Sequence, residues 1–148
     1  MNYVDANLMP NEQIIAHGYV HWWIYAQGAI VSLTGLILFV WTDFFGAVTL
    51  FIGLILLTKA WIHAFSTELV ITNRRVIAKF GFIRRNTVEL LHKSVESFHV
   101  EQSIMGRLLD FGTVIINGTG GVRTPIPGIA APLDFRRQAL NTIDNNTA

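Results

Sequence analysis

The side chains with the most evident chemistry are five basic residues in one short stretch, opposed between residues 64 and 85 only by Glu68. Beside a bilayer, each such residue contributes about 1 kcal/mol of attraction to anionic lipids. The sequence therefore predicts a lipid-binding site. A structural role stays open, in which these residues set membrane topology and pair with Glu89, Glu96 or a neighbouring subunit, because strand alternation separates Arg74 from Arg75. The five predicted lipid-binding residues are Arg74, Arg75, Lys79, Arg84 and Arg85.

Other chemical groups give weaker patterns. The absence of cysteine excludes disulfides, thiolate metal sites and cysteine nucleophiles. His17 and His21 lie four residues apart, but no third ligand nearby indicates zinc. Asn117–Gly121 is glycine-rich but lacks the lysine and the following helix of a phosphate-binding loop. We therefore expect no catalytic residue, no metal and no cofactor, and a function that is not enzymatic.

The distribution of charge points to a membrane. Of the 148 residues, 51% are hydrophobic and only 14% are charged, whereas soluble domains carry about 25% charged residues. Residues 22–58 contain a single charge, Asp43. The net charge of +1 gives no reason to expect a nucleic-acid partner.

Two apolar runs predict a transmembrane hairpin over residues 22–62. Residues 22–41 carry no charge, and residues 44–62 carry only Lys59 near their end. Each run has about the length that a helix needs to cross roughly 30 Å of hydrocarbon. Aromatic residues and a lysine that can reach the headgroups would mark the two membrane interfaces. These interface residues are Trp22, Trp23, Trp41, Lys59 and Trp61.

Small residues recur at heptad spacing on both predicted helices. Small side chains let membrane helices approach closely. They could pack the two helices of one hairpin together, or form a seam between protomers, and the sequence leaves both interpretations open. The predicted helix-packing residues are Gly28, Ser32, Gly35, Gly46 and Gly53.

The basic residues also predict an orientation. The turn between the two runs has no Lys or Arg, whereas Lys59, Arg74, Arg75 and Lys79 follow closely after it. The positive-inside rule places that side, and with it both termini, in the cytoplasm.

Residues 63–144 alternate between strand-like runs and turns. The helical period then appears from Pro132 onward, so the pattern predicts several antiparallel strands followed by one amphipathic helix. Residues 145–148 are expected to fray. Residues 1–21 form an N-terminal segment in which residues 13–20 could supply one more strand. The predicted strands are 67–72, 75–80, 87–91, 95–101, 113–117 and 122–126, with a helical turn at 104–110.

The region Thr67–Gly121 resembles the bacterial pleckstrin-homology-like (PH-like) domain family, whose members often follow two transmembrane helices. The resemblance is carried by T-N-R-R at Thr72–Arg75 with Gly81, by Arg85 and Glu89, and by G-R-L-L-x-x-G-T at Gly106–Thr113. The residues Met9–Gln13 (M-P-N-E-Q) also resemble the short lead found in the family.

This resemblance implies an α+β membrane protein, in which the transmembrane hairpin is followed by a PH-like antiparallel β-sandwich or barrel closed by a C-terminal helix. The expected location is the bacterial inner membrane. The expected function is a scaffold that associates with copies of itself or with an unidentified membrane or cytoplasmic protein. Binding of anionic membrane lipids is the alternative, and a ring-forming pore or transport subunit is a weaker one.

Overall fold

The computed structural model describes residues 7–81 and 86–147, and these residues fall into two units. One unit is a helical hairpin, residues 22–65. The other is a β-rich domain built from residues on both sides of the hairpin, 1–21 and 66–148. Arg84 and Arg85, two of the predicted lipid-binding residues, lie outside the described residues.

The hairpin consists of a short 3-10 turn, η1 (Trp22–Tyr25), and two long helices, α2 (Ala26–Trp41) and α3 (Asp43–Ser66). Thr42 alone joins the two helices. Its N–H donates to the carbonyl of Leu38, and its own carbonyl accepts from the N–H of Gly46, so one residue closes α2 and opens α3. The second predicted run, 44–62, is five residues shorter than α3, which begins one residue earlier and ends four residues later.

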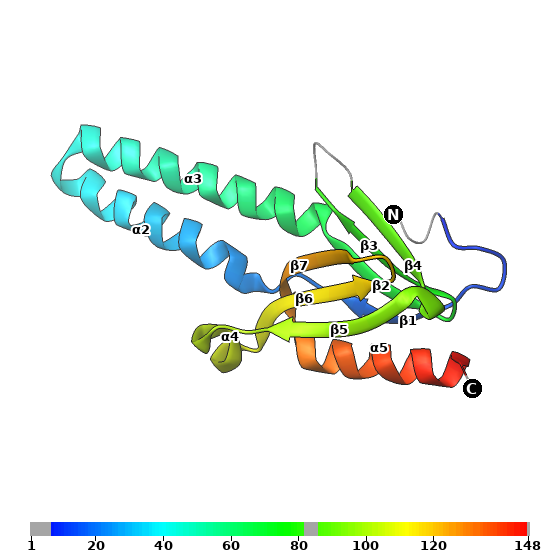
Figure 1. Ribbon diagram of the computed structural model, residues 1–148. Helices are drawn as coiled ribbons and strands as arrows, with labels where there is room; N and C mark the ends of the chain where they lie inside the picture. The colour runs from blue at the N-terminus through cyan, green and yellow to red at the C-terminus, as the bar shows by residue number, and fades with distance from the viewer. Residues whose placement is uncertain (1–6, 82–85, 148) are drawn as a thin grey trace. The chain divides into compact units, whose positions relative to one another are not determined.

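Seven strands form two antiparallel sheets, shown in Figure 1. Their inward residues share one core, which includes Leu69, Ile71 and Val76 from the first sheet and Val114 and Ile116 from the second. The first sheet has the order β1 (Ile14–Gly18), β2 (Glu68–Thr72), β3 (Arg75–Phe80) and β4 (Asn86–Leu91). The second has the order β5 (Val95–Glu101), β6 (Phe111–Gly118) and β7 (Val122–Ala130).

The hairpin occupies the connection between β1 and β2. These strands pair antiparallel, with Gly18 opposite Leu69, although 50 residues of chain separate the two positions. The domain therefore starts before the hairpin and resumes after it. The sequence pattern predicts a domain over residues 63–144, after the hairpin, and allows residues 13–20 to add one strand to it; β1 is that strand. The pairing partner of a strand decides to which domain the strand belongs, and neighbouring residues in the sequence do not reveal that partner.

Three helical elements complete the domain: η2 (His92–Ser94), α4 (Ile104–Leu109) and α5 (Pro132–Thr147). Phe135 and Ala139 of α5 belong to the shared core, with Ile143 packed against it. α5 extends through Thr147, and fraying of its last residues remains a prediction.

We expect a chain in which residues 22–65 are replaced by a short Gly/Ser linker to fold as a water-soluble domain. The linker closes easily because Gly18 and Leu69 already face one another. Residues 66–148 alone lack β1 and should not fold to the same stability. Urea denaturation followed by circular dichroism compares the two, and equal midpoints would contradict the role assigned to β1.

Candidate functional site

The most constrained polar group lies where the N-terminal segment meets the turn between β2 and β3. It consists of Glu12, Thr72, Arg75 and Glu89, and is called the Glu12–Arg75 cluster below. The side chain of Glu12 is 0% exposed and that of Arg75 is 8% exposed. Charges buried to this extent need close partners, because the cost of removing them from water is several kcal/mol per ion.

Arg75 and Glu12 meet in a bidentate ion pair. Nε of Arg75 donates to Oε1 of Glu12 at 2.9 Å, and Nη2 donates to Oε2 at 2.8 Å. Nη1 donates to the carboxylate of Glu89, a residue of β4. The hydroxyl of Thr72 lies 2.7 Å from Oε1 of Glu12, to which it can donate. Two paired hydrogen bonds of this kind fix orientation as well as distance.

The cluster holds residues 7–13 against the first sheet. The N–H of Met9 donates to Oε2 of Glu12 at 2.8 Å, which closes a short turn before β1. Asn73 accepts from the N–H of Gln13 through its side-chain oxygen, and its amide donates to the carbonyl of Asn11. These contacts join the N-terminal segment to the β2–β3 turn.

An apolar contact extends the same attachment. Leu8 packs against Val70 and Ile77, which are buried on the face of the first sheet opposite the main core. The segment 7–12 therefore covers that face through two side chains, Leu8 and Glu12.

The surroundings of Glu12 change its acidity. Burial by itself raises the pKa of Glu12, but hydrogen bonds from Arg75, from the Met9 N–H and from Thr72 outweigh it and lower the pKa from 4.5 to about 2. The pKa of Arg75 is raised, first by its hydrogen bonds to Glu12 and then by the negative charges of Glu89 and Glu12. Both groups are therefore charged at neutral pH.

His92 lies beside the cluster, at the end of β4. Its backbone N–H donates to the carbonyl of Arg74. Burial lowers the pKa of the imidazole below 6.5, and hydrogen bonding to the backbone of Thr72 and Arg75 offsets only part of that effect. His92 is therefore held in its neutral form at neutral pH.

The predicted lipid-binding residues do not form one patch in the part of the chain that the structure describes. Arg75 takes the structural role left open by the sequence, because it is buried and held by two carboxylates. Arg74 is exposed at the β2–β3 turn. Lys79 lies near the other end of β3, opposite Glu68 of β2. Arg74 and Lys79 therefore lie near opposite ends of β3.

Sequence reasoning missed the main partner of Arg75. The M-P-N-E-Q and T-N-R-R motifs were noted separately, yet Glu12 of the first binds Arg75 of the second across 63 positions. Neither helical nor strand periodicity connects two such distant residues. The one available signal was a lone acidic residue in a short apolar lead.

The small residues of the hairpin are used within the hairpin. A Cβ added to Gly35 would lie 2.4 Å from the backbone of Leu50, and one added to Gly46 would lie 2.2 Å from that of Phe39. A Cβ added to Gly53 would lie 2.3 Å from the hydroxyl and 2.6 Å from the backbone nitrogen of Ser32, and one added to Gly28 would lie 2.9 Å from Leu57. These close approaches correspond to the first of the two interpretations, in which small residues pack the helices of one hairpin.

The predicted interface residues lie at both ends of the hairpin helices. Trp41 is 82% exposed beside the turn, whereas Trp22 and Trp61 are about 60% exposed at the open end. Trp61 stacks on Phe65, and Trp23 contacts Trp22 edge to face. Lys59 is exposed near Trp61 on α3.

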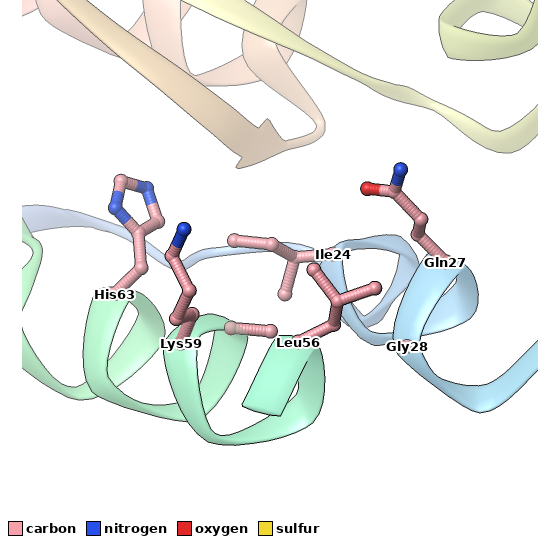
Figure 2. A pocket seen from close by; sticks show the side chains of 7 residues that line it. Ile24, Gln27, Gly28, Leu56, Lys59 and His63 are labelled. Carbon is pink, nitrogen blue, oxygen red and sulfur yellow. The ribbon is translucent and has the colours of Figure 1, made fainter. Parts of the chain in front are cut away.

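A hollow of about 290 Å³ lies between the helices at the open end of the hairpin (Figure 2). Its apolar wall includes Ile24 and Leu56. Figure 2 shows Lys59 and His63 of α3 extending to the same side as Gln27 of α2. This set of hydrogen-bond donors with one lysine is suited to an anionic group.

A second hollow, of about 500 Å³, lies in the domain beside the β3–β4 connection. Phe80, Thr87 and Val88 line it on one side, and the start of β7, residues 122–125, lines it on the other. Arg123 in this wall pairs loosely with the exposed Glu101 at 3.5 Å. Among the described residues, no group of three His, Cys, Asp or Glu gathers in either hollow or elsewhere.

A family comparison identifies the kind of domain. Residues 25–142 match the family described as "Bacterial PH domain". The chain also superposes on the crystal structure of a DUF1696 family protein with a pleckstrin-homology domain from Shewanella loihica PV-4. The sequence identity is 12%, the TM-score is 0.48, and the alignment covers 95% of this chain and 89% of that one. None of the curated proteins matches the chain.

We expect Glu12→Ala to lower the free energy of unfolding by roughly 3–5 kcal/mol, because it leaves the buried Arg75 without its bidentate partner. Urea denaturation of the full chain in mild detergent measures this loss. The double variant Glu12→Leu, Arg75→Leu should recover much of it, since no buried charge remains.

The matched control is Glu101→Ala. It breaks an ion pair whose two side chains are more than half exposed, so its cost should stay below about 1 kcal/mol. Equal losses for Glu12→Ala and Glu101→Ala would show that the burial of the first pair has no energetic consequence.

The depressed pKa of Glu12 also predicts how stability depends on pH. The unfolded chain binds a proton near pH 4.5, whereas the folded chain resists it down to about pH 2. Stability from Glu12 is therefore complete above pH 4.5 and is lost as the pH falls toward 2. His92, whose pKa burial lowers from 6.5, contributes a separate loss of stability as the pH falls below 6.5. In Glu12→Gln the free energy of unfolding lost between pH 4.5 and 2 should be smaller. An unchanged loss would mean that another carboxylate causes it.

Proposed function

The chain belongs to the bacterial PH domain family, and on that premise we propose that it is a membrane-anchored scaffold without enzymatic activity. In this proposal the hairpin spans the inner membrane twice, and the PH-like domain pairs with copies of itself on the cytoplasmic side.

The observation that carries the proposal is the exposed apolar surface of the hairpin. Trp22–Trp41 and Asp43–Ser66 are both long and apolar enough to cross a membrane. Core helices of soluble proteins pass the same test but are mostly buried. Here only 11% and 17% of the residues in the two apolar windows are buried. Such a surface is stable in lipid and unfavourable in water.

The place of the hairpin in the topology supports two crossings. β1 precedes the hairpin, β2 follows it, and the two strands pair in one sheet. Both ends of the hairpin must therefore emerge on the same side of the bilayer, which requires an even number of crossings. The basic residues after α3 favour the cytoplasm for that side.

A sheet edge that no other described strand pairs with supports self-association. β4 ends the four-stranded sheet and pairs with β3 on one side. Thr87, Glu89 and Leu91 lie on one exposed face of β4, and the one charge, Glu89, pairs with Arg75 while its side chain stays 40% exposed. Edges that have no proline and whose charge is already paired are templates for a second strand.

The other edges carry the features that normally block pairing. β7 contains Pro125 and Pro127. β5 carries Glu96 and Glu101. β1 is irregular near Ile14. β4 is thus the edge best suited to join a partner copy, and a two-fold β4–β4 contact would continue the sheet from one protomer into the next.

The role of the perturbed ionisable groups favours binding over catalysis. Glu12 and Arg75 neutralise one another inside the Glu12–Arg75 cluster, so neither is available to exchange a proton with a substrate. The anionic-lipid alternative has less support than the scaffold, because Arg75 is buried and Arg74 lies far from Lys79.

We expect the full chain to remain with the membrane until it is extracted by mild detergent, and then to have at least twice the mass of one chain. Thr87→Glu together with Leu91→Glu should convert it to a monomer. These positions would face each other across a two-fold contact with like charge, whereas within the domain they face Lys79 and Arg75. Size-exclusion chromatography with light scattering measures the mass.

The charge-matched control is Gln138→Glu together with Asn141→Glu, two exposed positions on α5, which should leave the oligomer intact. A chain found in the soluble fraction would refute the anchor. A monomeric wild type, or an oligomer that the β4 variant does not disturb, would refute the scaffold.

A further inference from the structure

We propose that α4 is a membrane-contact helix, whose apolar side chains insert among the lipid headgroups. This inference rests on the proposed membrane anchor and adds a second, peripheral contact between the domain and the bilayer.

The first argument is the exposure of α4. Ile104 is 87% exposed, Leu108 is 76% exposed and Met105 is 44% exposed. They occupy successive turns of one short helix, so they form a single apolar surface. Exposed apolar clusters of this kind mark contact sites.

The second argument is that α4 is built firmly in this position. Ser103 caps its start by accepting from the N–H of Gly106, and Asp110 ends it in the left-handed region with φ of 56°. Gln102 donates from its amide to the carbonyls of Gly106 and Phe111. The side that faces the domain is Gly106, where a Cβ would lie 2.5 Å from the carbonyl oxygen of Phe111. The large apolar residues consequently point away from the domain.

The third argument is the location of α4 between β5 and β6 (Figure 1). The ring of Phe111, two residues after the helix, stacks on His21 with centroids 5.4 Å apart. His21 is also held by its N–H, which donates to the carbonyl of Gly128. The next residue, Trp22, begins the hairpin. α4 therefore lies at the end of the domain from which the chain enters the membrane segment.

The occupant that fits this surface is lipid. Bulky apolar residues together with an arginine are the composition of helices that lie in a membrane interface. Arg107 is exposed on α4, where its guanidinium can reach lipid phosphates. A single residue separates His21 from the predicted interface residue Trp23, which leaves the chain no length to hold this end of the domain away from the headgroups.

The absence of cysteine from the chain allows a direct test with single-cysteine variants. Leu108→Cys and Ile104→Cys, each labelled with an environment-sensitive fluorophore, are placed in nanodiscs of mixed zwitterionic and anionic phospholipid. Spin-labelled lipids then act as quenchers. We expect quenching at both positions to be severalfold stronger than at Lys93→Cys, an exposed position before β5, roughly 20 Å of strand away from α4.

A label at Leu36→Cys, which is exposed on α2, reports on the hairpin separately. Quenching at residue 36 without quenching at residues 104 and 108 would overturn the α4 contact and leave the anchor intact. No quenching at residue 36 would overturn both. A label at residue 108 that is shielded from water but not quenched by lipid would assign α4 to a protein contact, and would also overturn the proposal.

Discussion

The antiparallel pairing of β1 with β2 is the contact on which the organisation of this chain depends. It brings Gly18 opposite Leu69, and the approach is close, since a Cβ on Gly18 would meet Leu69 at 3.2 Å and Phe135 at 3.3 Å. Everything between these strands must leave the domain and return to it. The hairpin is therefore an insertion in a domain and is held by covalent connections at both of its ends.

The Glu12–Arg75 cluster adds a second attachment between the N-terminal segment and the first sheet, at the β2–β3 turn. Replacing a buried ion pair by apolar residues is often neutral or stabilising. The main effect of this pair is therefore to fix where the N-terminal segment lies, and its contribution to stability is secondary. The bidentate geometry specifies one register between residues 7–13 and the β2–β3 turn. Leu8 adds apolar contact with Val70 and Ile77.

Local patterns predicted most of the domain because strand and helix preferences act over short distances. The predicted ranges 75–80 and 95–101 coincide with β3 and β5, and the fold resemblance is confirmed by the family match. Contacts between distant residues could not be predicted in this way. The extra strand expected at residues 13–20 corresponds to β1 (Ile14–Gly18), but its pairing with β2 and the pairing of Glu12 with Arg75 join residues far apart in the sequence. The role of Arg75 could not be predicted either, since burial and pairing decide whether an arginine is available to a ligand.

The position of the hairpin inside the domain has a consequence for biosynthesis. β1 is made before the hairpin, and its partner β2 is made after it, so strand pairing must wait until the intervening segment has been synthesised. Under the proposed anchoring, a hairpin that crosses only once would leave β1 and β2 on opposite sides of the bilayer. Glu12 would then remain in water, separated from Arg75. Completion of the sheet would thus signal correct membrane integration, and a chain that fails it would expose an unpaired strand to proteases.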